Sequence, residues 1–167
     1  MQNTTKKEYW INETLENVEN GGKTSIYNIY SPNHYRDKEK FWQTLRENTM
    51  EDRDENLIVG GDLNLILKAK EKRGGTFLPD LNKETLEEIM EQCNLLDIPP
   101  KNEKYTWDNR RIWKENIKER LDRILIWDRM AAMKKSNKRW KKNGEKIAFT
   151  IYTLLITTGT KRHASEH

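Results

Sequence analysis

The pattern of apolar and polar positions is most informative between residues 57 and 67, where the sequence reads LIVGGDLNLIL. Residues 57–59 form an uninterrupted apolar run with β-branched members, which predicts a central strand covered on both faces. The Gly-Gly pair that follows predicts a turn and a close approach of a ligand to the backbone. The chain is therefore expected to be organised around one buried strand.

Asp62 and Asn64 follow the glycines, two positions apart. In locally extended chain they point the same way, and Leu63 between them turns back toward the core. A carboxylate can activate water or hold a divalent cation, and a neutral amide can bind a phosphate oxygen without like-charge repulsion. Asp and Asn also occur after strands simply because they favour turns, and this short stretch alone favours that plainer interpretation.

A second strand is predicted on the N-terminal side of the central one. Residues 25–33, SIYNIYSPN, alternate along the chain, which predicts a strand that ends at Pro32. One of its faces is expected to carry Tyr27 and Ile29. The other face is expected to carry Ile26, Asn28 and Tyr30.

Apolar positions at helical spacing predict two helices. The first is expected to be capped by Asp37 and to end near Asn48, and the second to be capped near Asn82. Their apolar stripes are expected to be Phe41, Trp42 and Leu45 in the first helix, and Leu86, Ile89, Met90, Cys93 and either Leu95 or Leu96 in the second. Cys93 is accordingly expected to be a core residue rather than a nucleophile.

The remaining segments are less regular. For residues 8–18 we expect a strand or a frayed segment, and for residues 68–79 an exposed loop around Gly74-Gly75. Residues 119–127 and 147–156 predict two further strands. Strands that alternate with helices indicate the α/β class.

Length, charge and cysteine content indicate the number of domains, the kind of partner and the cellular compartment. A length of 167 residues predicts one domain. The net charge of +4 is uneven, because residues 128–146 hold eight Lys and Arg against two acids, so a basic partner surface is expected there. Cys93 is the only cysteine of the sequence, which favours a reducing intracellular compartment, nuclear or cytoplasmic. The polar N-terminus predicts no secretion signal, and residues 147–156 are too short to span a membrane.

Several short motifs follow one another along the chain. They are NIYSPN (28–33), FWQTL (41–45), IVGGDLN (58–64), Leu96-Asp97, YTW (105–107), RLDRIL (120–125) and SEH (165–167). Together they resemble the endonuclease/exonuclease/phosphatase superfamily, most closely the endonuclease domains that accompany reverse transcriptases in non-LTR retrotransposons. The resemblance implies a partial αββα sandwich of the AP-endonuclease/DNase I-like type, Mg²⁺-dependent cleavage of phosphodiesters, with Mn²⁺ as a substitute, and DNA as the partner.

The resemblance also implies roles for single residues. Tyr30 would contact the phosphate, Asp62 would position the attacking water or bind the metal, and Asn64 would hold the phosphate or that water. Asp122 would orient His167, which would stabilise charge on the phosphoryl oxygens; a carboxylate bonded to one ring nitrogen fixes the histidine tautomer. Plainer roles are a strand aromatic for Tyr30, an ion pair with Arg120 or Arg123 for Asp122, and a place in a disordered terminus for His167.

Five residues near these motifs are candidates for nucleic-acid contact through charge or stacking. They are Trp107, Arg110, Arg111, Lys68 and Arg73. Trp107 lies in an alternating segment, so it is expected first to pack beneath the site, with base stacking as the sharper alternative.

The resemblance breaks at both ends of the chain. In the family, a strand with an Asn and then a metal-binding Glu precede the equivalent of NIYSPN, and no Glu of the first 27 residues fits that context. The family's Ser-Asp-His is Ser165-Glu166-His167 here, which makes Glu166 a candidate metal ligand. The chain is interpreted as one incomplete domain over residues 1–167, with a core at 24–127, a basic segment at 128–146 and a terminal strand with SEH at 147–167.

Two other functions fit the sequence. A non-catalytic remnant would bind nucleic acid through residues 128–146. A phosphatase of the same fold would act on another phosphoester, such as an inositol phosphate or sphingomyelin. The retrotransposon-like motifs favour a DNA-nicking endonuclease over both.

Overall fold

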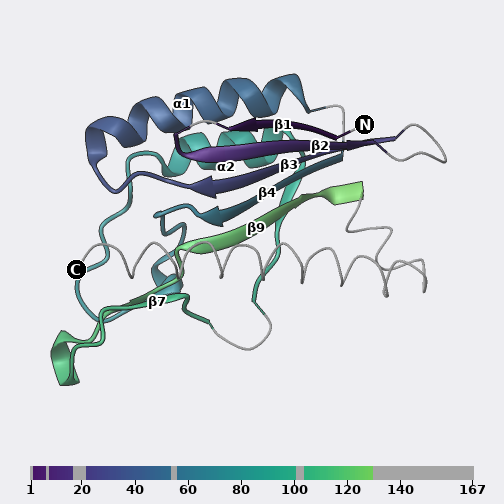
Figure 1. Cartoon of the computed structure of the whole chain (residues 1–167). Helices are drawn as coiled ribbons and strands as arrows, with labels where there is room; N and C mark the ends of the chain where they lie inside the picture. Colours follow the sequence, from purple (N-terminus) through teal and green to yellow (C-terminus); the bar gives the residue numbers. More distant parts are fainter. Residues whose placement is uncertain (1, 7, 17–21, 54–55, 101–103, 130–167) are drawn as a thin grey trace, which may run out of the picture.

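The computed structural model describes residues 2–6, 8–16, 22–53, 56–100 and 104–129 (Figure 1). Within them, the larger sheet has the strand order β1-β2-β3-β4-β9-β6 and the smaller one β5-β8-β7. The strands are β1 (Gln2–Lys6), β2 (Trp10–Glu16), β3 (Lys23–Tyr30), β4 (Asn56–Asp62), β5 (Lys72–Arg73), β6 (Leu95–Asp97), β7 (Trp107–Asp108), β8 (Lys118–Glu119) and β9 (Asp122–Trp127). The helices are α1 (Tyr35–Glu51) and α2 (Lys83–Gln92), with 3-10 turns η1 (Ala69–Glu71) and η2 (Trp113–Glu115).

Both α-helices cover the same face of the larger sheet (Figure 1). The hydrophobic core lies between the helices and that face of the sheet. The predicted apolar stripe of α1 is confirmed, since Phe41, Trp42 and Leu45 are all buried in this core. On β3, Tyr27 and Ile29 are each 2% exposed and face the helices, as the alternation predicts. The fold class is α/β.

The predicted central strand is β4, which pairs with β3 in parallel and with β9 in antiparallel orientation. Leu57, Ile58 and Val59 are at most 3% exposed. The predicted turn at the two glycines is wrong, because β4 continues through both of them to Asp62. Leu63 is fully buried, as expected for a side chain that turns back to the core.

Gly61 is required for the pairing of β4 with β3. Its φ is +136°, and a Cβ added to it would lie 1.9 Å from the carbonyl oxygen of Ile29 on β3. The two strands can therefore come together here only because residue 61 has no side chain.

The helix boundaries correct one detail of the sequence analysis and confirm another. α1 begins at Tyr35, so Asp37 lies in its first turn and is not the cap. α2 begins after Asn82, as predicted. At its C-terminal end Leu95 is 4% exposed and belongs to the core, whereas Leu96 is 46% exposed. Cys93 is fully buried, as expected for a core residue.

The segment after β4 is more ordered and more buried than the predicted exposed loop. It contains η1 and β5, and Glu71 within it is only 6% exposed. At the N-terminal end, β2 confirms the strand predicted within residues 8–18, and β1 was not predicted. The strand predicted at 147–156 and the basic segment beyond Arg129 lie outside the described residues.

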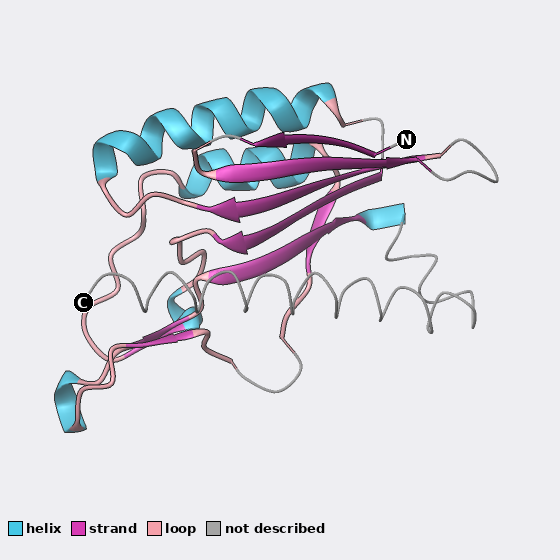
Figure 2. Cartoon of the chain, viewed as in Figure 1, coloured by secondary structure: helices cyan, strands magenta, loops and turns pink. Residues whose placement is uncertain are grey.

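The smaller sheet carries an arm made of β7, η2 and β8, which projects away from the helices at the lower left of Figure 2. Asp108 braces the arm, since its carboxylate accepts hydrogen bonds from the Lys118 ammonium (2.8 Å) and the Asn116 side chain (2.7 Å). The Lys118 contact and a hydrogen bond from the backbone N–H of Arg110, with a smaller contribution from Asn116, lower the pKa of Asp108 to about 2. Over the described part of the chain, no helix is long and apolar enough to cross a membrane.

The close contact at Gly61 predicts a large effect of a single methyl group. We expect Gly61→Ala to lower the free energy of unfolding by about 3 kcal/mol or more, because the new Cβ meets backbone and the φ is unfavourable for alanine. Urea denaturation followed by circular dichroism measures this. Gly75→Ala is the matched control, because the φ of Gly75 is also positive, at +63°, but its Cβ would meet only side chains, of which Ile117 is the nearest at 3.1 Å. Equal losses in the two variants would contradict the role given to Gly61.

Candidate functional site

Strand register brings three of the predicted site residues into one row. Tyr30 on β3 is the pairing partner of Asp62 on β4, and Asp62 is the partner of Asp122 on β9. Paired residues point to the same face of a sheet, with side chains roughly 5 Å apart at their base. Because Ile29 and Val59 face the helices, this row lies on the opposite face, at the end of the sheet where β3 and β4 finish.

Asn64 is held beside this row by a tight turn rather than by extended chain. Its φ is +45°, a left-handed conformation that Asn tolerates better than most residues. Its backbone N–H donates to Oδ1 of Asp62 (2.9 Å), and its side-chain Nδ2 donates to the carbonyl of Ser31 (2.7 Å). The turn therefore fixes the side chains of both Asp62 and Asn64.

Thr106 supports the other side of the row and was not predicted as a site residue. Its hydroxyl oxygen accepts hydrogen bonds from the backbone N–H groups of Leu121 and Asp122, both at 3.0 Å. The middle residue of the YTW motif therefore fixes the backbone of Asp122. The signal available in the sequence was the YTW motif itself, whose middle residue is Thr106.

A buried cluster of charges lies behind the row. Arg123 follows Asp122 on β9 and faces the other way, where it binds Glu71 and Asp97. Arg120 binds the same two carboxylates. The arginine side chains are 0% and 9% exposed, so the cluster is almost free of solvent. The arginines of the RLDR motif thus tie the larger sheet to the segment that carries η1 and β5.

Glu71 is the centre of this cluster. Its Oε2 also accepts the backbone N–H groups of Leu67 (2.9 Å) and Lys68 (3.2 Å). Burial alone would raise the pKa of the Glu71 carboxyl, but the hydrogen bond and charge of Arg123, with these backbone donors, outweigh burial and lower it. Glu71 is therefore held as a carboxylate at neutral pH.

The predicted nucleic-acid contacts fall in two exposed places. Lys68 and Arg73 are exposed on either side of η1, and Arg110 and Arg111 are exposed near the tip of the arm. Trp107 is 36% exposed on β7 and does not belong to the buried core among the described residues. The tip also carries Ile112 and Trp113, which are 75% and 89% exposed and were not predicted.

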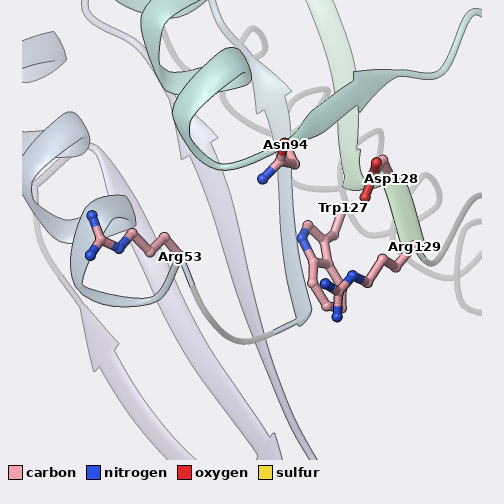
Figure 3. A pocket seen from close by; sticks show the side chains of 5 residues that line it. All are labelled: Arg53, Asn94, Trp127, Asp128 and Arg129. Carbon is pink, nitrogen blue, oxygen red and sulfur yellow. The ribbon is translucent and has the colours of Figure 1, made fainter.

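A polar pocket of about 290 Å³ lies at the other end of the sheet, lined by Arg53, Asn94, Trp127, Asp128 and Arg129 (Figure 3). The guanidinium of Arg129 sits over the Trp127 ring, 5.0 Å from its centroid. Trp127 ends β9, whereas Asp122 begins it, so this pocket is separate from the row.

Comparison with known proteins identifies the architecture. The endonuclease domain of TRAS1, a telomere-specific non-LTR retrotransposon, superposes with a TM-score of 0.56 at 12% identity, over 79% of this chain and 58% of that one. The AP endonuclease LMAP from Leishmania major gives a TM-score of 0.58 at 15% identity, over 77% of this chain and 48% of that one. This chain has the endonuclease/exonuclease/phosphatase fold. No family model and no curated protein matches the sequence.

The chain spans about half the length of the solved endonuclease/exonuclease/phosphatase structures that it matches. His167 and Glu166, which the motifs assign to the site, lie outside the described residues. The described residues contain no group of three or more His, Cys, Asp or Glu side chains that could hold a metal ion. Among them Asp62 is the candidate ligand, and Mg²⁺ is often bound by one or two carboxylates together with substrate phosphate.

Because of the charge cluster, we expect the free energy of unfolding to depend on pH, and we expect Glu71→Gln to remove this dependence. Glu71→Gln leaves the buried Arg123 without its main partner, and we expect the free energy of unfolding at pH 7 to fall by about 3 kcal/mol. Because the folded state lowers the pKa of Glu71, its contribution is complete above the usual carboxyl pKa of about 4.3 and is lost as the pH falls through the folded-state value. Denaturation between pH 7 and pH 3 measures both effects.

The control for this prediction is Glu88→Gln. Glu88 also pairs with an arginine, Arg46, but the two side chains are 49% and 46% exposed. We expect its loss to stay within about 0.5 kcal/mol. Parallel pH profiles for the wild-type chain and Glu71→Gln would contradict the role of Glu71.

Proposed function

We propose that the chain belongs to a metal-dependent phosphodiesterase, and specifically to an endonuclease that nicks DNA. The observation that carries this proposal is the row of Tyr30, Asp62 and Asp122, set by the register of β3, β4 and β9. A phenol and two carboxylates that share one face at a strand end can contact a phosphate, a water molecule and a cation together.

Each residue of the row has a definite task in this proposal. Asp62 orients or deprotonates the attacking water, and Asn64 holds that water or a phosphoryl oxygen. Tyr30 donates its hydroxyl to the phosphate. Asp122 orients a histidine, for which His167 is the candidate.

Mg²⁺, with Mn²⁺ as a substitute, is the cation proposed for this site. When bound, it would neutralise the charge that develops on the phosphoryl oxygens. Asp62 is the candidate ligand among the described residues, and Glu166 is a second candidate from the C-terminal end of the sequence. The site face of the sheet would present the phosphate to this cation.

The surface around the row supports nucleic acid as the substrate. Lys68 and Arg73 flank η1, directly after the strand that carries Asp62. Farther out, the arm presents Arg110 and Arg111 together with Trp107. Cations bind backbone phosphates irrespective of sequence, and an exposed indole can stack on a base. The similarity in fold to the TRAS1 endonuclease domain supports DNA in particular.

A second candidate function is binding of nucleic acid without cleavage. The exposed arginines and the 89% exposed Trp113 at the tip of the arm favour it, because they need no metal and no nucleophile. Binding of this kind would weaken steeply with salt. A nicking assay separates the two functions.

We expect the purified chain to convert supercoiled plasmid to nicked circle in Mg²⁺ and not in EDTA. Asp62→Asn should lower the nicking rate by about 100-fold or more, because the amide can neither accept a proton nor balance a cation. Gel electrophoresis of the plasmid measures the rate, and circular dichroism confirms that the variant is folded.

Glu88→Gln is the control for this substitution. It removes an exposed carboxylate of α2, which covers the face of the sheet opposite to the row. Its nicking rate should equal that of the wild-type chain. Nicking that persists in Asp62→Asn or in EDTA would overturn the proposed mechanism. A folded chain that binds plasmid in low salt and never nicks it would replace this proposal with the second candidate.

A further inference from the structure

Lys38 is a charged residue in an apolar position. It lies three, four and seven positions before Phe41, Trp42 and Leu45, so it continues the buried stripe of α1. Its side chain is only 11% exposed. A buried ammonium is costly unless it is paired and hydrogen-bonded, so its partners indicate why it is there.

The partners of Lys38 connect α1 with the turn that ends at the candidate site. Its Nζ donates to the backbone carbonyl of Asn64 (2.7 Å) and to the carboxylate of Asp80. Asp80 is itself held, because its Oδ1 accepts the backbone N–H of Asn82 at 2.9 Å. Asp80 thus holds the Lys38 ammonium in place, and the ammonium in turn binds the carbonyl of Asn64.

Asn64 is therefore anchored at three separate atoms. Its N–H is bound to Asp62, its carbonyl to Lys38, and its Nδ2 to the carbonyl of Ser31. Because a carbonyl is an acceptor only, Nδ2 and not Oδ1 must face Ser31. This choice fixes the direction of the Asn64 Oδ1 and of the second Nδ2 proton, the two groups with which it can bind water or phosphate.

We infer that Lys38 is a positioning residue, which holds Asn64 and, through it, the Asp62 carboxylate in the geometry that phosphodiester cleavage requires. The inference rests on the proposed function and names a residue outside the row. The left-handed conformation of Asn64 is strained, and a conformation of this kind persists only where its surroundings hold it. Without the ammonium, the Asn64 carbonyl loses its donor and the turn relaxes.

A purely structural role for Lys38 predicts different behaviour. The pair Lys72 and Glu119 offers the matched comparison, because it is also a lysine–carboxylate pair, with side chains 14% and 18% exposed, and it joins β5 to β8. If Lys38 only stabilised the fold, Lys38→Met and Lys72→Met would affect the site alike.

The test is a set of four variants followed by NMR of the Asn64 side-chain amide. They are Lys38→Met, Asp80→Asn, the double variant Lys38→Met/Asp80→Asn, and Lys72→Met. Hydrogen exchange at the Asn64 Nδ2 should quicken by about tenfold or more in both variants that lack Lys38. It should stay unchanged in Asp80→Asn, where the ammonium still reaches the Asn64 carbonyl, and in Lys72→Met.

The double variant keeps the test decisive if Lys38→Met fails to fold, because it leaves no buried carboxylate without a partner. Wild-type exchange at Asn64 in the double variant would overturn the inference. So would equally fast exchange in Lys72→Met or in Asp80→Asn. The amide signal requires no catalysis, so this result stands apart from the outcome of the nicking assay.

Nicking supplies the second readout. We expect the double variant to nick plasmid on the order of 100-fold more slowly with little change in KM, because a displacement of about 1 Å at a reacting group has an effect of that size. A KM effect alone would contradict positioning. Absence of nicking in the wild-type chain would refute the proposed function, while the exchange data would still decide whether Lys38 positions Asn64.

Discussion

The backbone contact between Gly61 and the carbonyl of Ile29 is the constraint on which the candidate site depends. These two residues are partners in the parallel pairing of β3 with β4, and the next pair along is Tyr30 with Asp62. A slip of one residue would turn Asp62 to the face that the helices cover. Since Asp62 is also the partner of Asp122 on β9, the same register places the second carboxylate. The register that Gly61 permits near the end of β4 thus places every residue of the row.

The alternation of β9 turns neighbouring charged residues of the RLDR motif to opposite faces of the sheet. Asp122 points to the site face, whereas Arg123 points to the helix face, where it is 2% exposed and bound to Glu71 and Asp97. Glu71 in turn holds the backbone just after β4. β9 therefore presents the carboxylate of Asp122 on one face of the sheet, while Arg123 on the other face binds the segment that carries η1.

Local periodicity predicted the parts of the fold that follow from one element at a time. The apolar run at 57–59 and the alternation around Tyr27 were interpreted correctly, because the burial of each depends on spacing alone. The buried Glu71 and Lys38 were not found, since their partners lie on other elements and a polar residue in isolation predicts exposure. Lys38 had one detectable signal, a charge on the apolar stripe of α1. The contact of Gly61 with Ile29 was not predicted, because the sequence does not reveal which backbone comes close to a glycine.

The measurement that tests the account most directly is a titration of the isotope-labelled chain with Mn²⁺, followed through its backbone amide spectrum. Paramagnetic broadening falls steeply with distance, so a cation held at the row would broaden Tyr30, Asp62 and Asp122 before any other described residue. Asp62→Asn should abolish this pattern. Broadening centred on another part of the chain, or the same pattern in Asp62→Asn, would contradict the claim that the register of β3, β4 and β9 builds a cation site.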